Sequence, residues 1–318
     1  MSNDNEFLWC EKYRPQIVFN TILPESLKSV FTNIVETGEL PNMLFSGSAG
    51  VGKTTVAKAL CEEMCLDYIV INGSDEGRRI TSDVMGKIKQ FASSVSLSGG
   101  HKVVILDEAD YLNLHSVQPA LRNFIEKYSE NCRFILTCNF KNRLIEPIHS
   151  RCSNIDFTIP KSQKPAIASQ FFNRIKSILA DESVTYDEKA LISVTQKFFP
   201  DFRRTLNELQ KYAISGSNTI DAGILTEVGD VDISDLMKYL KAKDFSQMRK
   251  WVVNNIDQDT PVIIRKLYNT MSEYIRPETI PAAILILAEY QFKDAWVADK
   301  ELNMVACLTE VMSTVEFK

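Results

Sequence analysis

The sequence has 318 residues, of which 45% are hydrophobic and 24% are charged, and its formal net charge is −5. A chain of this length is expected to form two or three domains, and its composition is that of an ordinary soluble globular protein. The acidic balance argues against a histone-like coat on nucleic acid, although a local basic channel for DNA remains compatible with it.

The ends of the chain and its cysteines favour an intracellular protein. The polar start, MSNDNEFLWCEK, has no apolar stretch typical of a signal peptide. The longest apolar run, near PAAILILAEY, is far shorter than the roughly 18 residues that a membrane span needs. Seven scattered cysteines without a secretion signal favour reduced thiols. We interpret Cys61 and Cys65 as buried apolar side chains, because two ligands do not make a zinc site.

Strands and helices alternate over the first half of the chain. Short apolar runs predict strands at 42–46, 67–71, 102–106, 132–138 and 153–159. Between them, helix-forming runs predict helices at 53–65, 82–94 and 115–129, with Ser82 as a plausible cap of the second. This alternation predicts an α/β fold with a parallel sheet and helices on both of its faces.

The second half of the chain reads as helical. After Pro160, helical patterns cover 162–182, 187–199 and 200–213, and no further strand is evident. A loop rich in Gly, Ser and Asn follows at 215–223, and the pattern is helical again from about residue 229. The last helical run is strongly apolar on one face, so we expect it to be buried or shared with a partner.

A glycine-rich segment predicts a nucleotide site. GSAGVGKTT matches the pattern G-x-x-x-x-G-K-[ST], and it follows a predicted strand and opens a predicted helix. Backbone N–H groups of such a loop curl around phosphate oxygens. We expect Lys53 to reach the β- and γ-phosphates of ATP and the Thr54 hydroxyl to ligate Mg²⁺. The predicted loop contacts are Gly47, Gly50, Val51, Gly52, Lys53, Thr54 and Thr55.

Two carboxylates and an amide follow the next buried strands. In VVILDEAD, Asp107 is placed to hold Mg²⁺ through water, and Glu108 to polarise the attacking water. Asn139 closes the strand FILTCN and can orient that water against the γ-phosphate. The alternatives are a solvated acidic strand end for the carboxylates and a turn-forming residue for Asn139.

These elements, in this order, resemble the AAA+ ATPases, and the finer motifs resemble sliding-clamp-loader subunits. The segments EKYRP, NGSDEGRRI, DEADYLNLHSVQPALRNFIEKYS, SRC and PDFRRTLNELQ are similar to motifs of the replication factor C small subunits. The resemblance implies that Tyr13, Arg14 and Pro15 line the adenine pocket and that Arg203 is the sensor arginine. Without it, Arg203 would be a surface arginine and Tyr13 a buried anchor.

The segments FPDFR and IDAGIL look most like the corresponding segments of the large ATPase subunits of T4-type bacteriophages. Two positions depart from the family pattern. Pro200 stands where a glycine is usual before the sensor aspartate, and Asn123 replaces the second arginine of ALRR. Neither belongs to the phosphate loop or the acidic pair, so ATP hydrolysis remains the expectation.

The segment PIHSRC carries the motif that the resemblance identifies as an arginine finger. Arg151 would act in trans, on the γ-phosphate held by a neighbouring subunit, where its planar fork stabilises developing charge. We expect Pro147 to end the preceding helix and Cys152 to be buried packing. Without the resemblance, Arg151 would be interpreted as an ordinary surface residue.

A basic stretch predicts a DNA contact. Residues 76–102 contain five Lys or Arg and two Asp or Glu, in an acidic protein. The resemblance places the helix that opens there against a central DNA channel, with contacts to phosphates. The predicted contacts are Arg78, Arg79, Thr81, Ser82 and Lys87. The alternative is a solvated basic face.

Together these features predict the ATPase subunit of a sliding-clamp loader, located in the host cytoplasm if phage-encoded. We expect a nucleotide module at 1–160, a helical lid at 161–228 and a helical oligomerisation collar at 229–318. The resemblance implies a sliding clamp, primer–template DNA, further copies of the chain and a smaller companion subunit as partners in a pentamer, and no membrane. The alternatives are a helicase-type AAA+ motor and a non-catalytic scaffold subunit.

Overall fold

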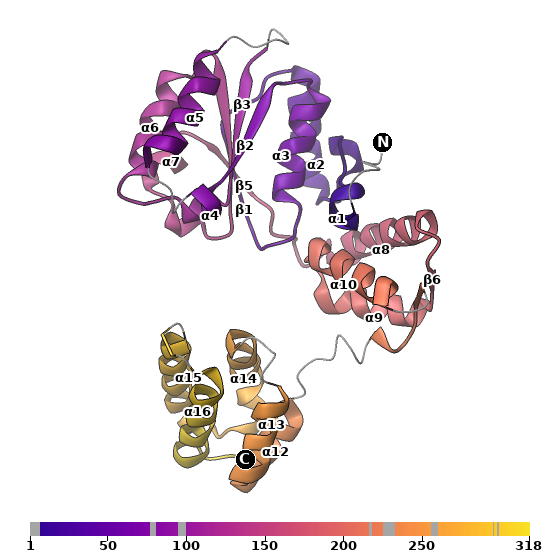
Figure 1. Cartoon of the computed structure of the whole chain (residues 1–318), viewed down its shortest axis with the longest axis vertical. Coiled ribbons are helices and arrows are strands. Elements are labelled where there is room, and N and C mark those ends of the chain that lie inside the picture. Colours follow the sequence, from indigo (N-terminus) through magenta and orange to yellow (C-terminus); the bar gives the residue numbers. More distant parts are fainter. Residues whose placement is uncertain are drawn as a thin grey trace. The chain divides into compact units, whose positions relative to one another are not determined.

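The structure is a computed structural model that describes residues 7–76, 81–94, 100–215, 218–224, 233–255, 260–294, 296–297 and 299–318. For residues 75, 76 and 81–84 it describes the backbone alone. The chain divides into two compact units, Met1–Glu227 and Val228–Lys318 (Figure 1).

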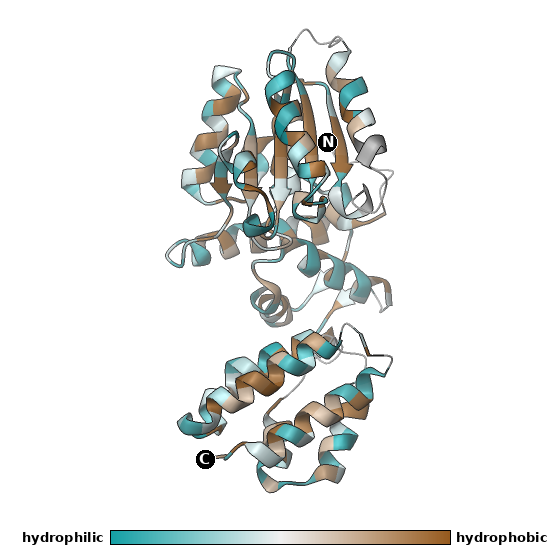
Figure 2. Cartoon of the chain, turned by 90° about the vertical axis from the view of Figure 1, so that its left-hand side faces the viewer, coloured by the Kyte–Doolittle hydropathy of each residue, from teal (hydrophilic) through white to brown (hydrophobic). Residues whose placement is uncertain are grey.

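A five-stranded parallel sheet forms the centre of the first unit. Its strands are β1 Met43–Ser46, β2 Tyr68–Asn72, β3 Lys102–Asp107, β4 Cys132–Cys138 and β5 Ser153–Asp156. They lie in the order β2-β3-β4-β1-β5, and every neighbouring pair is parallel. The α/β prediction is confirmed, although β5 ends three residues earlier than predicted. The inner strands read as apolar runs because both of their faces are covered, and Figure 2 shows the sheet as largely hydrophobic.

Helices cover both faces of this sheet (Figure 1). On one face lie α5 Thr81–Ser93, α6 Val117–Lys127 and α7 Glu146–His149, and on the other α2 Glu25–Thr37 and α3 Lys53–Glu63. The shorter elements are α1 Trp9–Lys12, η1 Val18–Asn20, α4 Gly73–Glu76, η2 Ala109–Tyr111 and η3 Lys141–Arg143.

Helix α2 lies outside the predicted elements. It is held by aromatic packing, because Phe31 meets Phe45 at a ring-centroid distance of 5.4 Å and Phe157 at 6.0 Å. All three rings are almost completely buried. An edge-to-face pair of this kind adds about 0.5–1.5 kcal/mol beyond its area burial.

Three helices follow the sheet within the first unit: α8 Lys164–Asp181, α9 Glu188–Phe198 and α10 Phe202–Ser215. The prediction of no strand after Pro160 is wrong, because β6 Thr185–Tyr186 pairs in parallel with β7 Thr219–Ile220. Two residues are too few to show the alternation that predicts a strand. This pair ties the start of α9 to the segment that follows α10.

The second unit is helical and has a core of its own. It contains α12 Ile233–Ala242, α13 Phe245–Asn254, α14 Thr260–Tyr274, η4 Pro277–Thr279, α15 Ile280–Asp294 and α16 Lys300–Thr314. The apolar face of α16 is buried in that core through Cys307, Leu308 and Val311. Among the helices that the structure describes, none has the length and apolar character needed to span a lipid bilayer.

The cysteine prediction is half right. Cys61 is completely buried on α3, whereas Cys65 is exposed just beyond that helix, in a left-handed backbone conformation with φ 53°. Within the described ranges, no group of His, Cys, Asp and Glu side chains is arranged to hold a metal ion by itself.

Candidate nucleotide-binding site

The glycine-rich loop joins β1 to α3 at the carboxyl edge of the sheet. Gly50 and Gly52 have φ of +73° and +94°, which L side chains rarely adopt. At Gly50 a Cβ atom would also come within 1.8 Å of Oδ1 of Asp201, the residue just before α10. The backbone N–H of Phe202 donates to the Gly50 carbonyl at 3.1 Å. The loop is therefore in direct contact with the start of α10, and only glycine fits there.

Lys53 is buried at the centre of this loop, with 8% of its surface exposed. Its Nζ donates to the carbonyls of Gly47 at 2.8 Å and Ser48 at 2.7 Å, and to Oδ1 of Asn139 at 2.8 Å. Burial lowers the pKa of Lys53, and neighbouring acidic groups oppose that change. The structure thus brings Lys53 together with Asn139, from the end of β4.

The predicted Mg²⁺ ligands lie side by side. The hydroxyl of Thr54 donates to Oδ1 of Asp107 at 2.6 Å. A hydroxyl and a carboxylate are the hard oxygen ligands that Mg²⁺ takes in phosphate-binding sites. Thr54 and Asp107 therefore fit Mg²⁺ and would hold it where it supplies positive charge for the phosphates.

One buried residue missed in the sequence holds both acidic positions. Thr137, on β4, donates from its hydroxyl to Oδ1 of Asp107 at 2.5 Å. The same hydroxyl accepts the backbone N–H of Glu108 at 3.1 Å. Glu108 itself is in the left-handed region, with φ 53° and ψ 45°. Conformations of this kind persist where surrounding contacts enforce them.

A cavity connects these groups to the N-terminal segment and to the helices after the sheet. It is lined by the predicted residues Tyr13, Arg14, Pro15, Gly50, Val51, Gly52, Lys53, Thr54, Thr55, Asp107, Glu108, Asn139 and Arg203. Gly47 does not line it, but its carbonyl accepts from Lys53. Phe171, Arg174 and Phe202 also line the cavity, and no sequence pattern predicted them as site residues.

Arg14 provides a test of whether a nucleotide fits. Its Nη2 pairs with Glu11. In the described part of the chain its Nε and Nη1 are buried without a hydrogen-bond partner. A buried donor left unsatisfied costs about 1–3 kcal/mol, and polar atoms of a bound ligand would remove that cost. The unsatisfied donors of Arg14 therefore fit a polar ligand in this cavity.

The N-terminal segment is anchored to the helices after the sheet. Glu182, just beyond α8, accepts hydrogen bonds from Lys12 Nζ and Tyr13 Oη, each at 2.7 Å. Arg174 donates from Nη2 to the carbonyl of Tyr13 at 3.1 Å. Burial raises the pKa of Glu182, but the bonds from Lys12 and Tyr13 outweigh it and hold this pKa below its usual value. Partners some 170 residues apart leave no sequence pattern.

Two buried polar residues, Asp110 and Gln118, hold in place the segments near the acidic pair Asp107 and Glu108. Asp110 accepts the backbone N–H groups of Asn139 and Phe140 through Oδ2, at 3.3 and 3.2 Å. Gln118, on α6, donates to the carbonyls of Leu112 and Arg143 at 3.0 and 3.1 Å. These bonds hold Asn139 at its place beside Lys53 and attach the η3 segment to α6.

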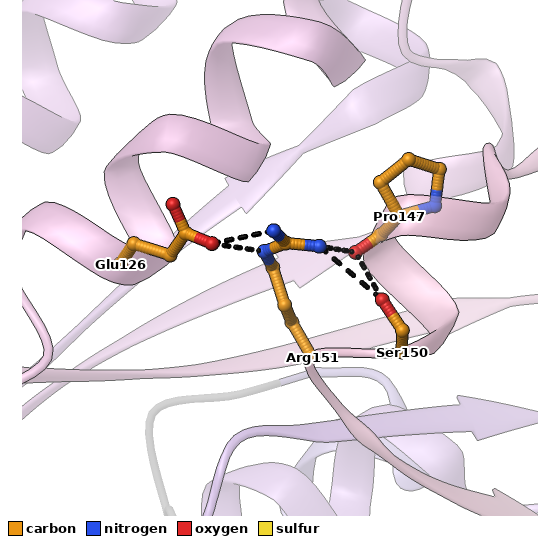
Figure 3. A network of polar contacts seen from close by, with 4 residues as sticks. All are labelled: Glu126, Pro147, Ser150 and Arg151. Carbon is orange, nitrogen blue, oxygen red and sulfur yellow. Dashed lines mark hydrogen bonds and ion pairs between the residues drawn. The ribbon is translucent and has the colours of Figure 1, made fainter.

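Arg151 is not among the residues that line this cavity. Figure 3 shows its polar contacts. Its guanidinium pairs with Glu126 of α6, and its Nη1 donates to the carbonyl of Pro147 at 2.8 Å. Pro147 does not end a helix as predicted. It occupies the first turn of α7, where its missing N–H costs nothing. Cys152 is buried, as expected.

The DNA-contact predictions are described only in part. Arg78 and Arg79 lie outside the described residues. Thr81 and Ser82 open α5, where only the backbone is described, and Lys87 is exposed on that helix. Lys102, counted in the basic stretch, is buried instead. Its Nζ donates to Ser94 Oγ at 2.6 Å and lies 4.7 Å from the centre of the Phe91 ring, so it stabilises the end of α5.

The sequence matches two family models. One, the ATPase family associated with various cellular activities, matches residues 43–160. The other, the AAA+ ATPase lid domain of the sliding-clamp-loader large subunit, matches residues 163–226.

Known proteins match over the whole chain. The sliding-clamp-loader large subunit of Enterobacteria phage T4 is 34% identical, and that of Escherichia phage RB69 38% identical, each over 99% of both chains. The replication factor C small subunit of Sulfurisphaera tokodaii is 31% identical over 98% of this chain and 97% of its own. Among solved structures, a RuvB mutant of Thermotoga maritima is similar with a TM-score of 0.54 and 18% identity, covering 74% of this chain and 80% of that one. At that identity the likeness shows the fold alone.

Proposed function

The chain belongs to the sliding-clamp-loader large subunits, a family of AAA+ ATPases, and from this premise we propose how its site works. It is an ATP-hydrolysing clamp-loader subunit of DNA replication. ATP binding holds the sliding clamp open, and primer–template DNA triggers hydrolysis and closure of the clamp. The observation that carries the proposal is the meeting of Lys53, Asn139, Asp107 and Glu108 at one edge of the sheet.

Each group has one task at the phosphates. The Lys53 ammonium exchanges its bonds to loop carbonyls for bonds to the β- and γ-phosphates, and Asn139 keeps it in place. Glu108 accepts a proton from the attacking water. Thr54 and Asp107, whose side chains are hydrogen-bonded to each other, would hold Mg²⁺. Arg203 is exposed on α10 at the edge of the cavity. There it senses the phosphates and transmits their presence to the helices after the sheet.

Arg151 completes the site of a neighbouring copy. Its absence from the lining of its own cavity supports this role, since a finger that served its own chain would line that cavity. The assembly is a pentamer of copies of this chain and a smaller companion subunit. Residues 1–160 form the nucleotide module, 161–228 the lid and 229–318 the collar through which subunits associate.

The surface of the second unit supports the collar. Apolar side chains that would normally avoid water are exposed there, with 72% of Leu285, 73% of Phe292 and 81% of Trp296 accessible. Large exposed apolar groups of this kind mark protein–protein contacts. We assign them to contacts between subunits.

The test mixes two inactive variants, Lys53→Ala and Arg151→Ala, in one assembly. Some interfaces then pair an intact phosphate loop with an intact finger, and part of the ATPase activity should return. If each variant assembles and mixing restores nothing, the role of Arg151 in trans is wrong. A helicase-type motor, the alternative, would hydrolyse ATP on DNA without regard to the clamp, so the assay is run with and without clamp and primed DNA.

A further inference from the structure

The guanidinium of Arg151 is almost fully occupied within its own chain (Figure 3). Nε donates to Oε1 of Glu126 at 2.8 Å, and Nη2 pairs with the same oxygen. Nη1 donates to the Pro147 carbonyl at 2.8 Å and to Ser150 Oγ at 3.2 Å. A guanidinium has five N–H donors, and these contacts engage four of them.

This occupation conflicts with binding a phosphate. Arginine recognises phosphate through a pair of donors that point the same way, either Nε with Nη2 or Nη1 with Nη2. In Arg151 each such pair already has at least one donor committed to a partner in the chain. The Glu126 carboxylate also cancels the positive charge on which a finger depends. Arg151 therefore cannot bind a γ-phosphate fully until Glu126 releases it.

The ion pair between Arg151 and Glu126 is weak enough for Arg151 to be released easily. The side chain of Glu126 is 57% exposed and that of Arg151 23%. Ion pairs as exposed as this are weak, because water solvates the separated charges well. The multiply charged triphosphate of a neighbouring site can therefore displace one carboxylate. Pro147 and Ser150 hold Nη1 from the other side, so the finger keeps its orientation when Glu126 lets go.

We propose that Glu126 is the positioning residue that holds Arg151 against α6 until the neighbouring subunit presents its nucleotide. We call the arrangement in which Arg151 is paired with Glu126 the parked state. The proposal rests on the role of Arg151 in trans. It adds that the finger exists in two states, one paired with Glu126 and one paired with phosphate. Hydrolysis without DNA is slow in part because the first state dominates. Primer–template DNA favours the second state by drawing adjacent subunits together.

The test uses the same mixed assemblies, with Glu126→Gln added to one chain at a time. Gln keeps the size of the side chain and removes its charge. On the Lys53→Ala chain, which supplies the finger, the substitution should raise the DNA-independent ATPase rate about two- to fivefold, the range expected for losing an exposed ion pair. On the Arg151→Ala chain, which has no guanidinium to release, it should bring no rise. The gain should appear in kcat and not in KM, because Glu126 does not line the cavity.

Glu130→Gln is the matched control. Glu130 is an exposed carboxylate just beyond the end of α6, and Arg151 makes its contacts with Glu126 instead. On the finger-supplying chain it should leave the rate unchanged. A lower or unchanged rate with Glu126→Gln, or an equal rise from either chain, would overturn the parked state while leaving the finger itself intact. If the mixture without Glu126→Gln is already inactive, the role in trans fails and the parked state falls with it.

Discussion

The hydroxyl of Thr137 donates to Oδ1 of Asp107 at 2.5 Å and so joins β4 to the end of β3. The Thr137 hydroxyl oxygen also accepts the backbone N–H of Glu108, the residue after Asp107, at 3.1 Å. Thr137 is 1% exposed, so water cannot take over these bonds if the hydroxyl is lost. One small side chain thus holds both Asp107, the proposed magnesium ligand, and Glu108, the proposed base.

Thr137→Val should therefore impair hydrolysis more than ATP binding. Valine fills nearly the same volume but leaves the Glu108 N–H unsatisfied, a cost of about 1–3 kcal/mol. We expect kcat to fall about tenfold or more and the Mg²⁺ concentration for half-maximal rate to rise. Steady-state ATPase measured over a magnesium series checks this. Thr137→Ser keeps the hydroxyl and should stay near wild type. Equal activity of the Val and Ser variants would contradict the assignment.

Glu108→Gln should separate binding from chemistry. The amide cannot accept the proton of the attacking water, and losing a positioned base costs about 10²-fold or more in rate. ATP affinity, measured with a fluorescent analogue, should stay nearly unchanged. The assembly should then stall with clamp and DNA bound. Wild-type turnover in the variant would show that another group activates the water.

Glu182→Gln should weaken ATP binding although Glu182 does not line the cavity. Its carboxylate holds Lys12 and Tyr13, and Tyr13 does line it. We expect the affinity to fall about three- to tenfold, the scale of one net hydrogen bond. The matched control is Glu188→Gln, which removes an exposed carboxylate from the same group of helices. Equal effects of the two variants on affinity would argue against the anchor.

The same variant should change the response to acid. Because the bonds from Lys12 and Tyr13 hold the pKa of Glu182 below its unfolded value of 4.5, the carboxylate stabilises the fold above that pH. This contribution disappears as the pH falls through the lowered pKa of the folded state. Thermal melting followed from pH 6 to about pH 3 should show a shallower loss of stability in Glu182→Gln than in wild type.

Neutralising Arg79 and Lys87 together should reduce the DNA-stimulated ATPase rate and spare the basal rate. The lost phosphate contacts should also flatten the dependence of DNA affinity on salt, by about one unit of slope for each charge removed. Neutralising Lys161 and Lys164, which are exposed and do not belong to α5, controls for the change in net charge. A matching fall in the basal rate would point to misfolding or to a role at the nucleotide.

The site residues that could be predicted from the sequence are those whose roles depend on neighbours in the same segment. The phosphate loop and the acidic pair lie within continuous segments whose spacing the phosphates dictate, so the roles of Lys53 and Asp107 could be predicted from the pattern alone. Thr137 was not, because within FILTC it fits an apolar strand and its task depends on a bond to the neighbouring strand. Glu182 and Gln118 were missed for the same reason. Their partners are distant or are backbone atoms, which carry no sequence signal.

Proline and the shortest elements show the same limit. Pro147 breaks a helix when inside it and favours one at its first turn, and the residues around it do not distinguish the two cases. Strands β6 and β7 have two residues each, so no periodicity can reveal them. Helix α2 owes its place to the rings of Phe45 and Phe157, which come from strands and loops elsewhere in the chain.

The contact of the N-terminal segment with α10 also has a consequence for biosynthesis. The backbone N–H of Trp9 donates to Oε1 of Gln210, a partner 201 residues further along the chain. At a translation rate of about 5–20 residues per second, the ribosome delivers that partner about 10 to 40 s after Trp9. During this interval the nascent sheet can form while the wall of its cavity is missing. We therefore expect the growing chain to bind nucleotide only late in synthesis, after α10 has left the ribosome.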